Sequence, residues 1–245
     1  MPIMKIDDFE MYYEIHGELN EIPLVLIMGL GSDAQLWMLQ IPEFSKNYRL
    51  ITFDNRDAGR TSKTDVKYTI DTMAEDTYNL LEKLGVMKSH ILGFSMGGMI
   101  AQTFALKYPE KVRSLILCAT ASRGLKGLGV LKMWNELIGT VTRIANNPIV
   151  EQLAKYFYIQ MPKEFFRQCE AVEKFDVMNH LKEIRAPTLV LAGDRDTVIP
   201  IWSAWEMASK IPNAEFKVLW GCGHALFIEK WWEFNKEVLQ FLEKH

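Results

Sequence analysis

Short apolar runs alternate with segments of helical periodicity along most of this chain, and the alternation limits the folds that it can adopt. Continuous apolar runs are typical of strands that are buried on both faces of a sheet. They are Leu24–Met28, Arg49–Phe53, His90–Phe94, Ser114–Cys118 and Thr188–Ala192. Phe9–His16 alternates like a strand with one wet face, and Phe216–Trp220 is the expected last strand. Because parallel strands need crossover connections, the sequence predicts an α/β fold, a mostly parallel central sheet with helices on both faces.

Three segments have the apolar spacing of helices that cover such a sheet. The first runs from Ile70 to Leu84 and is followed by Gly85, a residue that commonly ends helices. The second, Met99–Tyr108, is apolar on nearly all sides. In the third, near the C-terminal end, one stripe is predicted to contain Phe227, Ile228, Trp231, Phe234, Val238 and Phe241.

One segment interrupts the alternation. From about residue 122 to residue 182 the sequence is helical in character, rich in Trp, Tyr, Phe and Met, and without a strand-like run. It follows the strand that contains Cys118, so an insertion there would lie over the carboxyl ends of the strands. We therefore expect residues 1–121 and 183–245 to form a core domain and residues 122–182 to form a helical lid.

Composition excludes several classes of protein. With 49% hydrophobic and 24% charged residues the chain is an ordinary globular sequence, and a formal net charge of −3 gives no reason to expect a nucleic acid or an anionic membrane as partner. The 3 cysteines lack metal-ligand spacing and are expected to be reduced thiols. The N-terminal residues do not resemble a signal peptide, and no apolar run has the length of a membrane span, so we expect a cytoplasmic protein.

The pattern Gly93-Phe94-Ser95-Met96-Gly97 lies between a predicted strand and a predicted helix. Small flanking residues allow a sharp strand-to-helix turn that exposes the serine hydroxyl for attack. The pattern alone arises by chance in roughly one chain in ten of this length, and it could also be a glycine-rich packing turn. The strand before it and the helix after it favour Ser95 as a nucleophile.

A serine nucleophile needs a base and a carboxylate that orients the base. Of the 5 histidines, His224 lies in a glycine-containing loop between the last strand and the last helix, at the same sheet edge as Ser95 if the strands are parallel. The alternative is a surface histidine that caps a helix. Gly193-Asp194-Arg195-Asp196 also follows a predicted strand. Either aspartate satisfies the chemistry, and the other would then form the turn or pair with Arg195.

The oxyanion that develops during acyl transfer needs backbone N–H donors. One is expected from Met96, directly after the nucleophile, and the other from Leu30 in the loop Met28-Gly29-Leu30-Gly31. That loop is not a dinucleotide-binding loop, because it lacks the third glycine and the acidic residue downstream.

These motifs together resemble the α/β-hydrolase superfamily, and the resemblance extends over most of the chain. It is carried by Gly93-Phe94-Ser95-Met96-Gly97-Gly98, by Gly193 with Asp196 three positions later, and by Gly223-His224 with Glu229 beyond. The resemblance implies that Asp196 is the triad acid and that the lid is inserted after the sixth strand. The chain order serine, aspartate, histidine also agrees with this superfamily.

One further segment, residues 54–62, resembles the structural loop after the family's fourth strand. Two residues depart from the family's pattern. Met28 stands where histidine is usual, and Asp57 stands where glycine is commoner. In both departures the chain looks similar to small bacterial esterases, anthracycline methylesterases and enol-lactonases.

The sequence therefore predicts a serine hydrolase that cleaves small to medium carboxylic esters through an acyl-enzyme, with neither cofactor nor metal. The lid would supply an acyl pocket, with Trp134, Tyr156, Phe157 and Phe165 as its lining, although these aromatics could merely pack the lid onto the sheet. The remaining tryptophans are expected in the core. The same triad would also serve a lactone or enol-lactone hydrolase, a C–C bond hydrolase or a cofactor-free perhydrolase. A non-catalytic receptor for a small apolar molecule is the alternative outside enzymes.

Overall fold

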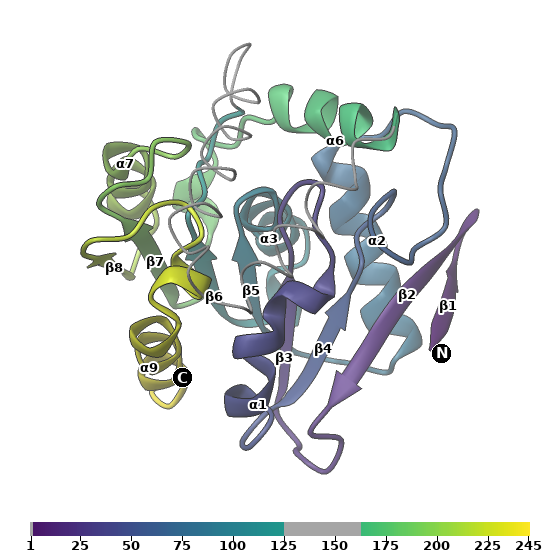
Figure 1. Ribbon diagram of the computed structural model, residues 1–245, viewed down its shortest axis with the longest axis horizontal. Helices are drawn as coiled ribbons and strands as arrows, with labels where there is room; N and C mark the ends of the chain where they lie inside the picture. The colour runs from purple at the N-terminus through teal and green to yellow at the C-terminus, as the bar shows by residue number, and fades with distance from the viewer. Residues whose placement is uncertain (1, 125–162) are drawn as a thin grey trace, which may run out of the picture.

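The computed structural model describes residues 2–124 and 163–245, and Figure 1 shows a central sheet in them with helices on both sides. The sheet has 8 strands in the order β1-β2-β4-β3-β5-β6-β7-β8. The strands are β1 (Ile3–Ile6), β2 (Phe9–His16), β3 (Pro23–Ile27), β4 (Arg49–Phe53), β5 (Ser89–Phe94), β6 (Val112–Cys118), β7 (Thr188–Gly193) and β8 (Ala214–Leu219). β2 is antiparallel to β1 and β4, whereas all pairs from β4 to β8 are parallel. The predicted α/β architecture is confirmed.

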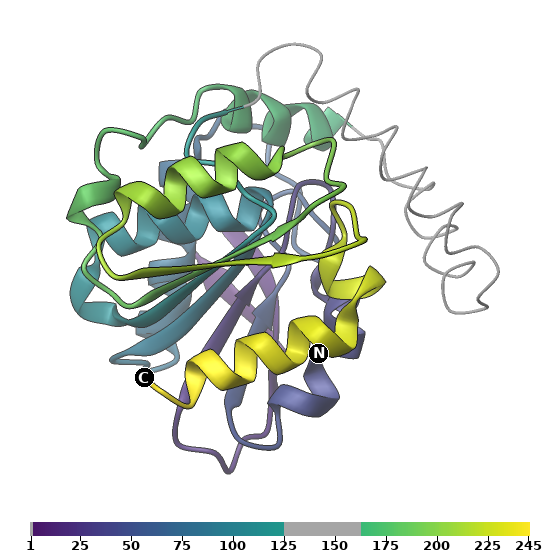
Figure 2. The ribbon, with the colours of Figure 1, turned by 90° about the vertical axis from the view of Figure 1, so that its left-hand side faces the viewer.

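Helices cover the two faces of the sheet, as the views in Figures 1 and 2 show. The α-helices are α1 (Ile41–Phe44), α2 (Ile70–Lys83), α3 (Met96–Lys107), α6 (Lys163–Glu173), α7 (Ile201–Lys210), α8 (Leu226–Glu229) and α9 (Trp231–Leu242). The short 3-10 helices are η1 (Ala34–Leu39), η2 (Pro109–Lys111) and η3 (Leu181–Glu183). The predicted helices of residues 70–84 and 99–108 correspond to α2 and α3.

The sheet separates two apolar cores, as the period of a strand requires. In β3, Val25 and Ile27 pack in the cluster that α2, α3 and α7 cover. Leu24 and Leu26 of the same strand pack in the other cluster, which contains residues of α8 and α9. All five residues of β3 are therefore buried, and this explains the continuous apolar run in the sequence.

β1 is absent from the strands predicted above. It has only four residues and lies at the edge of the sheet, with Ile6 buried and Ile3 52% exposed. A short edge strand of this kind has neither the continuous apolar run of a buried strand nor a long alternation.

The prediction that one helix forms the apolar stripe near the C-terminal end is wrong in one respect. The segment forms two helices, α8 and α9, which meet at Lys230 in a non-helical backbone conformation. Phe227 and Phe234 are buried as expected, but Trp231 at the start of α9 is 40% exposed. The break at Lys230 changes the direction of the chain, so one helical period cannot hold across it.

The expectation that the remaining tryptophans belong to the core is wrong for five of the six. Trp37 is the one buried tryptophan among the residues that the structure describes, and five others are exposed to between 40% and 70%: Trp202, Trp205, Trp220, Trp231 and Trp232. In α7 the buried face is formed by Ala204, Met207 and Ala208, which leaves Trp202 and Trp205 on the outer surface.

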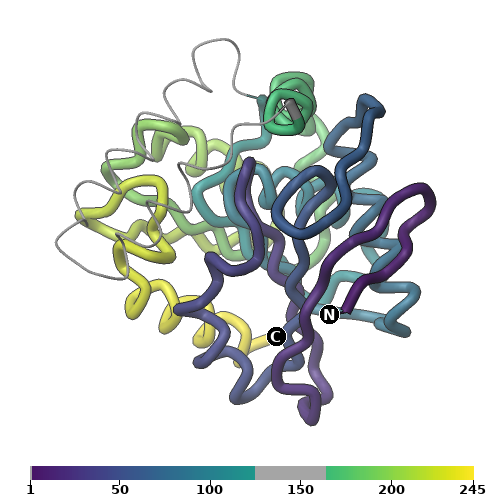
Figure 3. Tube along the Cα trace, turned by 45° about the vertical axis from the view of Figure 1, so that its right-hand side comes forward, coloured from purple at the N-terminus to yellow at the C-terminus, as the bar shows by residue number. Residues whose placement is uncertain are grey.

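α6 belongs to the segment predicted as a lid. It lies across the loops that follow β3 and β4, where Gln168 contacts Gly31 and Arg56. Figure 3 shows α6, in green, close to the blue loop after β4. Residues 163–173 are thus helical, as expected for the insertion, whereas the division into core and lid domains stays a prediction. No helix in the described parts of the chain is both long enough and apolar enough to cross a membrane.

Candidate active site

Ser95 occupies a sharp turn between β5 and α3. Its backbone has φ 54° and ψ −119°, a strained combination for a residue other than glycine. A Cβ on Gly93 would clash with the carbonyl of Gly97, and a Cβ on Gly97 would clash with the carbonyl of Ile27 in β3. The flanking glycines therefore allow the turn to close, as the sequence predicted, and the turn lifts the serine side chain out of the sheet.

Three side chains from different strand ends meet at this turn. His224 Nε2 lies 3.0 Å from Ser95 Oγ, and His224 Nδ1 lies 2.8 Å from Asp196 Oδ2. An ionised carboxylate can only accept a hydrogen bond, so Nδ1 carries the proton and Nε2 is left to accept from the serine hydroxyl. Ser95, Asp196 and His224 follow β5, β7 and β8, whose carboxyl ends share one edge of the sheet. All three are buried, with exposures of 7%, 7% and 5%.

The two aspartates of the loop after β7 have different partners. Asp196 Oδ1 accepts hydrogen bonds from the N–H groups of Val198 and Ile199, which leaves Oδ2 to face the imidazole. Asp194 Oδ1 accepts from the N–H groups of Gly221 and Cys222 instead. Of the roles left open by the sequence, Asp196 contacts the histidine and Asp194 forms the turn.

The loop that holds His224 is fixed from several sides. Glu229 Oε2 accepts from the N–H of Gly223 at 3.1 Å, and the carbonyl of Cys222 accepts from the N–H of Arg195. The ring of Phe94, directly before the serine, lies 5.1 Å from the imidazole ring in a tilted arrangement. These contacts hold the imidazole between the serine and the carboxylate.

The loop after β3 approaches the serine closely. A Cβ on Gly29 would lie 3.2 Å from the Cβ of Ser95. The N–H of Ser32 donates to the carbonyl of Gly29, and Gly31 has φ +69°. These are the features of a type II turn over Gly29-Leu30-Gly31-Ser32, in which the third position favours glycine.

Of the predicted oxyanion donors, Met96 directly follows Ser95, and Leu30 follows Gly29, which approaches Ser95. The carbonyl of Gly29 points to Ser32, and because the C=O and N–H of a trans peptide point in opposite directions, the N–H of Leu30 points away from Ser32. Met96 is the first residue of α3, so its N–H has no acceptor within the helix. Such N–H groups are the kind of donor that binds a developing oxyanion.

Sequence reasoning missed two polar residues that support this arrangement. Thr120 Oγ1 donates to the carbonyl of Ser95 at 2.7 Å, and Gln168 Oε1 accepts from the N–H of Gly31 at 2.8 Å. Thr120 follows β6 and Gln168 belongs to α6, 137 residues from Gly31 in the chain. Neither residue lies in a motif, so the sequence contained no local signal for either contact.

Asp57, one of the departures from the family pattern, has a structural explanation. Its φ is +65°, a conformation that glycine adopts freely and aspartate tolerates. The carboxylate then accepts from the N–H of Thr64 at 2.7 Å and from Arg167 Nε at 2.8 Å. The aspartate thus attaches the loop after β4 to α6, which a glycine could not do.

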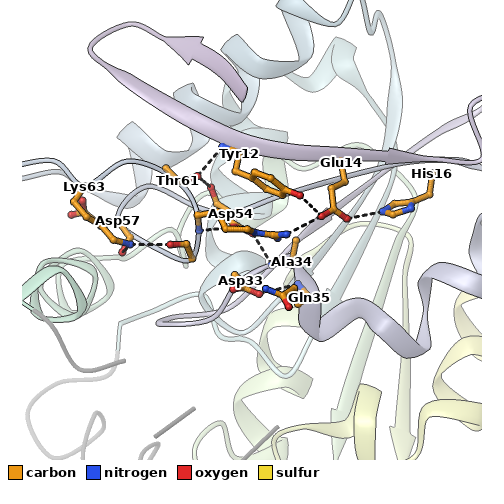
Figure 4. A network of polar contacts seen from close by, with 12 residues as sticks. Tyr12, Glu14, His16, Asp33, Ala34, Gln35, Asp54, Asp57, Thr61 and Lys63 are labelled. Carbon is orange, nitrogen blue, oxygen red and sulfur yellow. Dashed lines mark hydrogen bonds and ion pairs between the residues drawn. The ribbon is translucent and has the colours of Figure 1, made fainter. Parts of the chain in front are cut away.

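The rest of that loop is held by a buried polar network, which Figure 4 shows. Asp54 accepts hydrogen bonds from the N–H of Ala34 and from the guanidinium of Arg60. Asp33 lies next to it and accepts from the N–H of Gln35 at 2.9 Å. Burial, with the nearby charge of Asp54, raises the pKa of the Asp33 carboxyl to about 6.

Of the predicted pocket residues, the structure describes Phe165. It is buried in α6, and its ring lies against Gly31, 2.9 Å from the position that a Cβ on this glycine would take. The ring therefore packs on the turn that contains Leu30. Trp134, Tyr156 and Phe157 lie outside the described residues. Within residues 2–124 and 163–245, no group of three or more His, Cys, Asp or Glu side chains is arranged to hold a metal ion.

Comparisons with known proteins agree with this geometry. A family model described as the alpha/beta hydrolase fold matches residues 22–148 and 144–230. The putative carbamate hydrolase RutD of Agrobacterium fabrum is 29% identical over 255 residues, which cover 95% of this chain and 98% of that protein.

Solved structures are similar over nearly the whole chain. The enol-lactonase from Burkholderia xenovorans has a TM-score of 0.90 at 25% identity and covers 99% of this chain and 100% of its own. A thermophilic esterase from Thermogutta terrifontis has a TM-score of 0.84 at 26% identity and covers 96% and 94%. The resemblance inferred from the sequence motifs is confirmed: the chain belongs to the alpha/beta hydrolase fold family.

Proposed function

We propose that this protein is a serine hydrolase that cleaves small to medium carboxylic esters through an acyl-enzyme intermediate. The observation that carries the proposal is the continuous hydrogen-bonded series from Ser95 through His224 to Asp196, with distances of 3.0 Å and 2.8 Å. A buried serine in hydrogen-bond reach of an imidazole that a carboxylate orients is the arrangement that activates a nucleophile.

In this mechanism Ser95 Oγ attacks the ester carbonyl while His224 Nε2 accepts the serine proton. Asp196 accepts from Nδ1–H and stabilises the imidazolium that forms. The N–H groups of Leu30 and Met96 bind the oxyanion of the tetrahedral intermediate. When that intermediate collapses, the imidazolium gives its proton to the departing alcohol. Water then attacks the acyl-enzyme with His224 as base and releases the acid and Ser95.

Lactone hydrolysis is the second candidate, and the similarity to an enol-lactonase, with a TM-score of 0.90, favours it. The chemistry is the same, except that the leaving alcohol stays attached to the acyl group. The same triad would also serve C–C bond hydrolysis or perhydrolysis, and a receptor with this fold would bind its ligand without turnover. The proposed partner is in each case a small molecule, and no step of the mechanism requires a cofactor.

We propose an acyl pocket that includes Phe165, at the turn that contains Leu30, and the other aromatic residues predicted from the sequence, Trp134, Tyr156 and Phe157. An enclosed pocket makes a prediction about substrate size. Each enclosed methylene contributes about 0.8 kcal/mol until the pocket is full. We expect kcat/KM to rise and then fall with acyl length, with its maximum at short to medium chains.

The test is a hydrolysis screen across p-nitrophenyl esters of increasing acyl length, lactones, carbamates and vinylogous diketones. Ser95→Ala is the blank, and Ser209→Ala, which removes an exposed serine of α7, is the matched control. We expect ester turnover in the wild type and in Ser209→Ala, and none above background in Ser95→Ala. Ester turnover that persists in Ser95→Ala, or a wild type that binds these compounds without turnover, contradicts the proposal.

A further inference from the structure

Gln168 of α6 connects two loops that border Ser95. Its side-chain oxygen Oε1 accepts from the N–H of Gly31 at 2.8 Å, and its Nε2 donates to the carbonyl of Arg56 at 2.9 Å. The residue is only 1% exposed. A buried amide with both ends satisfied by backbone groups is costly to displace, because each backbone group would then lose its partner. The contact therefore constrains the loop after β3.

The N–H of Gly31, which donates to Gln168, belongs to the central peptide of the turn Gly29-Leu30-Gly31-Ser32, the peptide between Leu30 and Gly31. A four-residue turn can place its central peptide in two opposite orientations, which distinguish type I from type II. The φ of +69° at Gly31 corresponds to type II. An acceptor on the N–H of Gly31 selects that orientation, because the other orientation turns this N–H away from Gln168.

We propose that Gln168 is a positioning residue that fixes the central peptide of this turn and thereby keeps the adjoining Gly29–Leu30 peptide in place beside Ser95, where the Leu30 N–H serves the oxyanion. The inference rests on the proposed function, in which Leu30 supplies an oxyanion donor. It adds that α6, which belongs to the predicted insertion, sets the rate of acyl transfer and does not only enclose the substrate. Phe165 packs on the same glycine from one turn earlier in the helix.

Arg167 provides a control variant, because it attaches α6 to the rest of the protein without contacting the turn around Leu30. Its guanidinium pairs with Asp57 at 2.8 Å and donates to the carbonyl of Thr64. These contacts attach α6 to the loop after β4, and the turn around Leu30 takes no part in them. Arg167→Gln therefore weakens the attachment of α6 but leaves the acceptor for Gly31 N–H in place.

The experiment compares Gln168→Met, Gln168→Glu and Arg167→Gln with the wild type, using the best ester substrate and a boronic acid that mimics its acyl group. A boronic acid forms a tetrahedral adduct with the serine and reports on the oxyanion site. We expect Gln168→Met to lower kcat about 10- to 100-fold, less than the loss of a donor itself. Its KM should stay nearly unchanged, and its boronate affinity should fall in parallel with kcat. Gln168→Glu keeps an acceptor for Gly31 N–H but loses the donor to the Arg56 carbonyl, so its kcat should lie between those of Gln168→Met and the wild type.

Thermal melting of each variant fixes a temperature at which all are folded, and amide exchange at Gly31 reports on the turn itself. Exchange should accelerate in Gln168→Met and not in Arg167→Gln. Equal losses of kcat in the two variants, or a change confined to KM, overturn the inference. So does a Gln168→Met enzyme with full kcat. A wild type whose rate equals that of Ser95→Ala contradicts the proposed function instead, so the two failures are distinguishable.

Discussion

Asp194 and Asp196 lie two residues apart, and their carboxylates accept hydrogen bonds from different parts of the site. Asp196 faces the imidazole of His224, whereas Asp194 holds the backbone of Gly221 and Cys222. The contacts predict that replacement by asparagine affects kcat strongly at Asp196 and little at Asp194. Asp196→Asn can present an N–H where the imidazole N–H needs an acceptor, and this favours the wrong tautomer. The loss in kcat should approach ~10⁴, the size of this effect in a serine protease.

Asp194→Asn is the matched control, because an asparagine oxygen can still accept from the two N–H groups. We expect little change in kcat for this variant and a small loss of stability of the histidine loop. Steady-state kcat of the two asparagine variants is the measurement. If Asp194→Asn is the crippled enzyme, the assignment is reversed, and if neither loses much activity, another acid orients His224.

The buried carboxyl of Asp33 gives a second prediction about a single residue. The residue is 2% exposed, and burial near Asp54 raises the pKa of its carboxyl to about 6. Between the unfolded value near 3.8 and this folded value, the native state binds more protons than the unfolded chain. Its contribution to stability is therefore complete below pH 4 and is lost as the pH rises to 6. Asp33→Asn should stabilise the protein by about 1–3 kcal/mol at pH 7.5, with the gain disappearing towards pH 4.

Urea unfolding at pH 7.5, 6 and 4 measures this difference. Asparagine preserves the cap at the start of η1, where the side chain accepts from Gln35 N–H, since it caps helices about as well as aspartate. Asp33→Ala removes both the charge and the cap and should be less stable than Asp33→Asn at every pH. An asparagine variant with no gain at pH 7.5 would show that the carboxylate is well compensated there.

Single residues were predictable where a local pattern indicated them. Ser95 and His224 each follow a strand and lie close to a glycine, so strand ends were sufficient to predict that they meet, whereas the choice of Asp196 over Asp194 came from the resemblance to the α/β-hydrolases. Thr120 and Gln168 have no such signature, because their contacts depend on how β6 and α6 pack. The positions of Trp134, Tyr156 and Phe157 in the proposed pocket stay predictions.

At the scale of the element, the buried strands and α2 and α3 could be predicted because their apolar periods are long and uninterrupted. The helical period of the C-terminal segment gave a wrong prediction because the helix is interrupted at Lys230, between α8 and α9. The apolar period also failed at β1, whose edge position leaves its apolar side chains partly exposed. α6 was expected as part of an insertion, but its attachment through Gln168 and Arg167 was not, since these contacts join residues more than a hundred positions apart.

For the whole molecule, the parallel sheet determines the site, because it brings the loops after β3, β5, β7 and β8 to one edge. This is the reason that a sequence pattern could predict both the fold and the triad. The sequence pattern did not predict which large apolar side chains lie on the surface. The tryptophans of α7 and α9 lie outside the core, since smaller side chains on the inner face of α7 fill the space against the sheet.

The central claim is that Ser95 is the nucleophile, and covalent labelling tests it most directly. A fluorophosphonate reacts with an activated serine, so intact mass spectrometry should show one adduct per chain, and peptide mapping should place it on Ser95. Ser95→Ala should take up no label, whereas Ser209→Ala should be labelled like the wild type. A label on another residue, together with ester turnover in Ser95→Ala, would contradict the account.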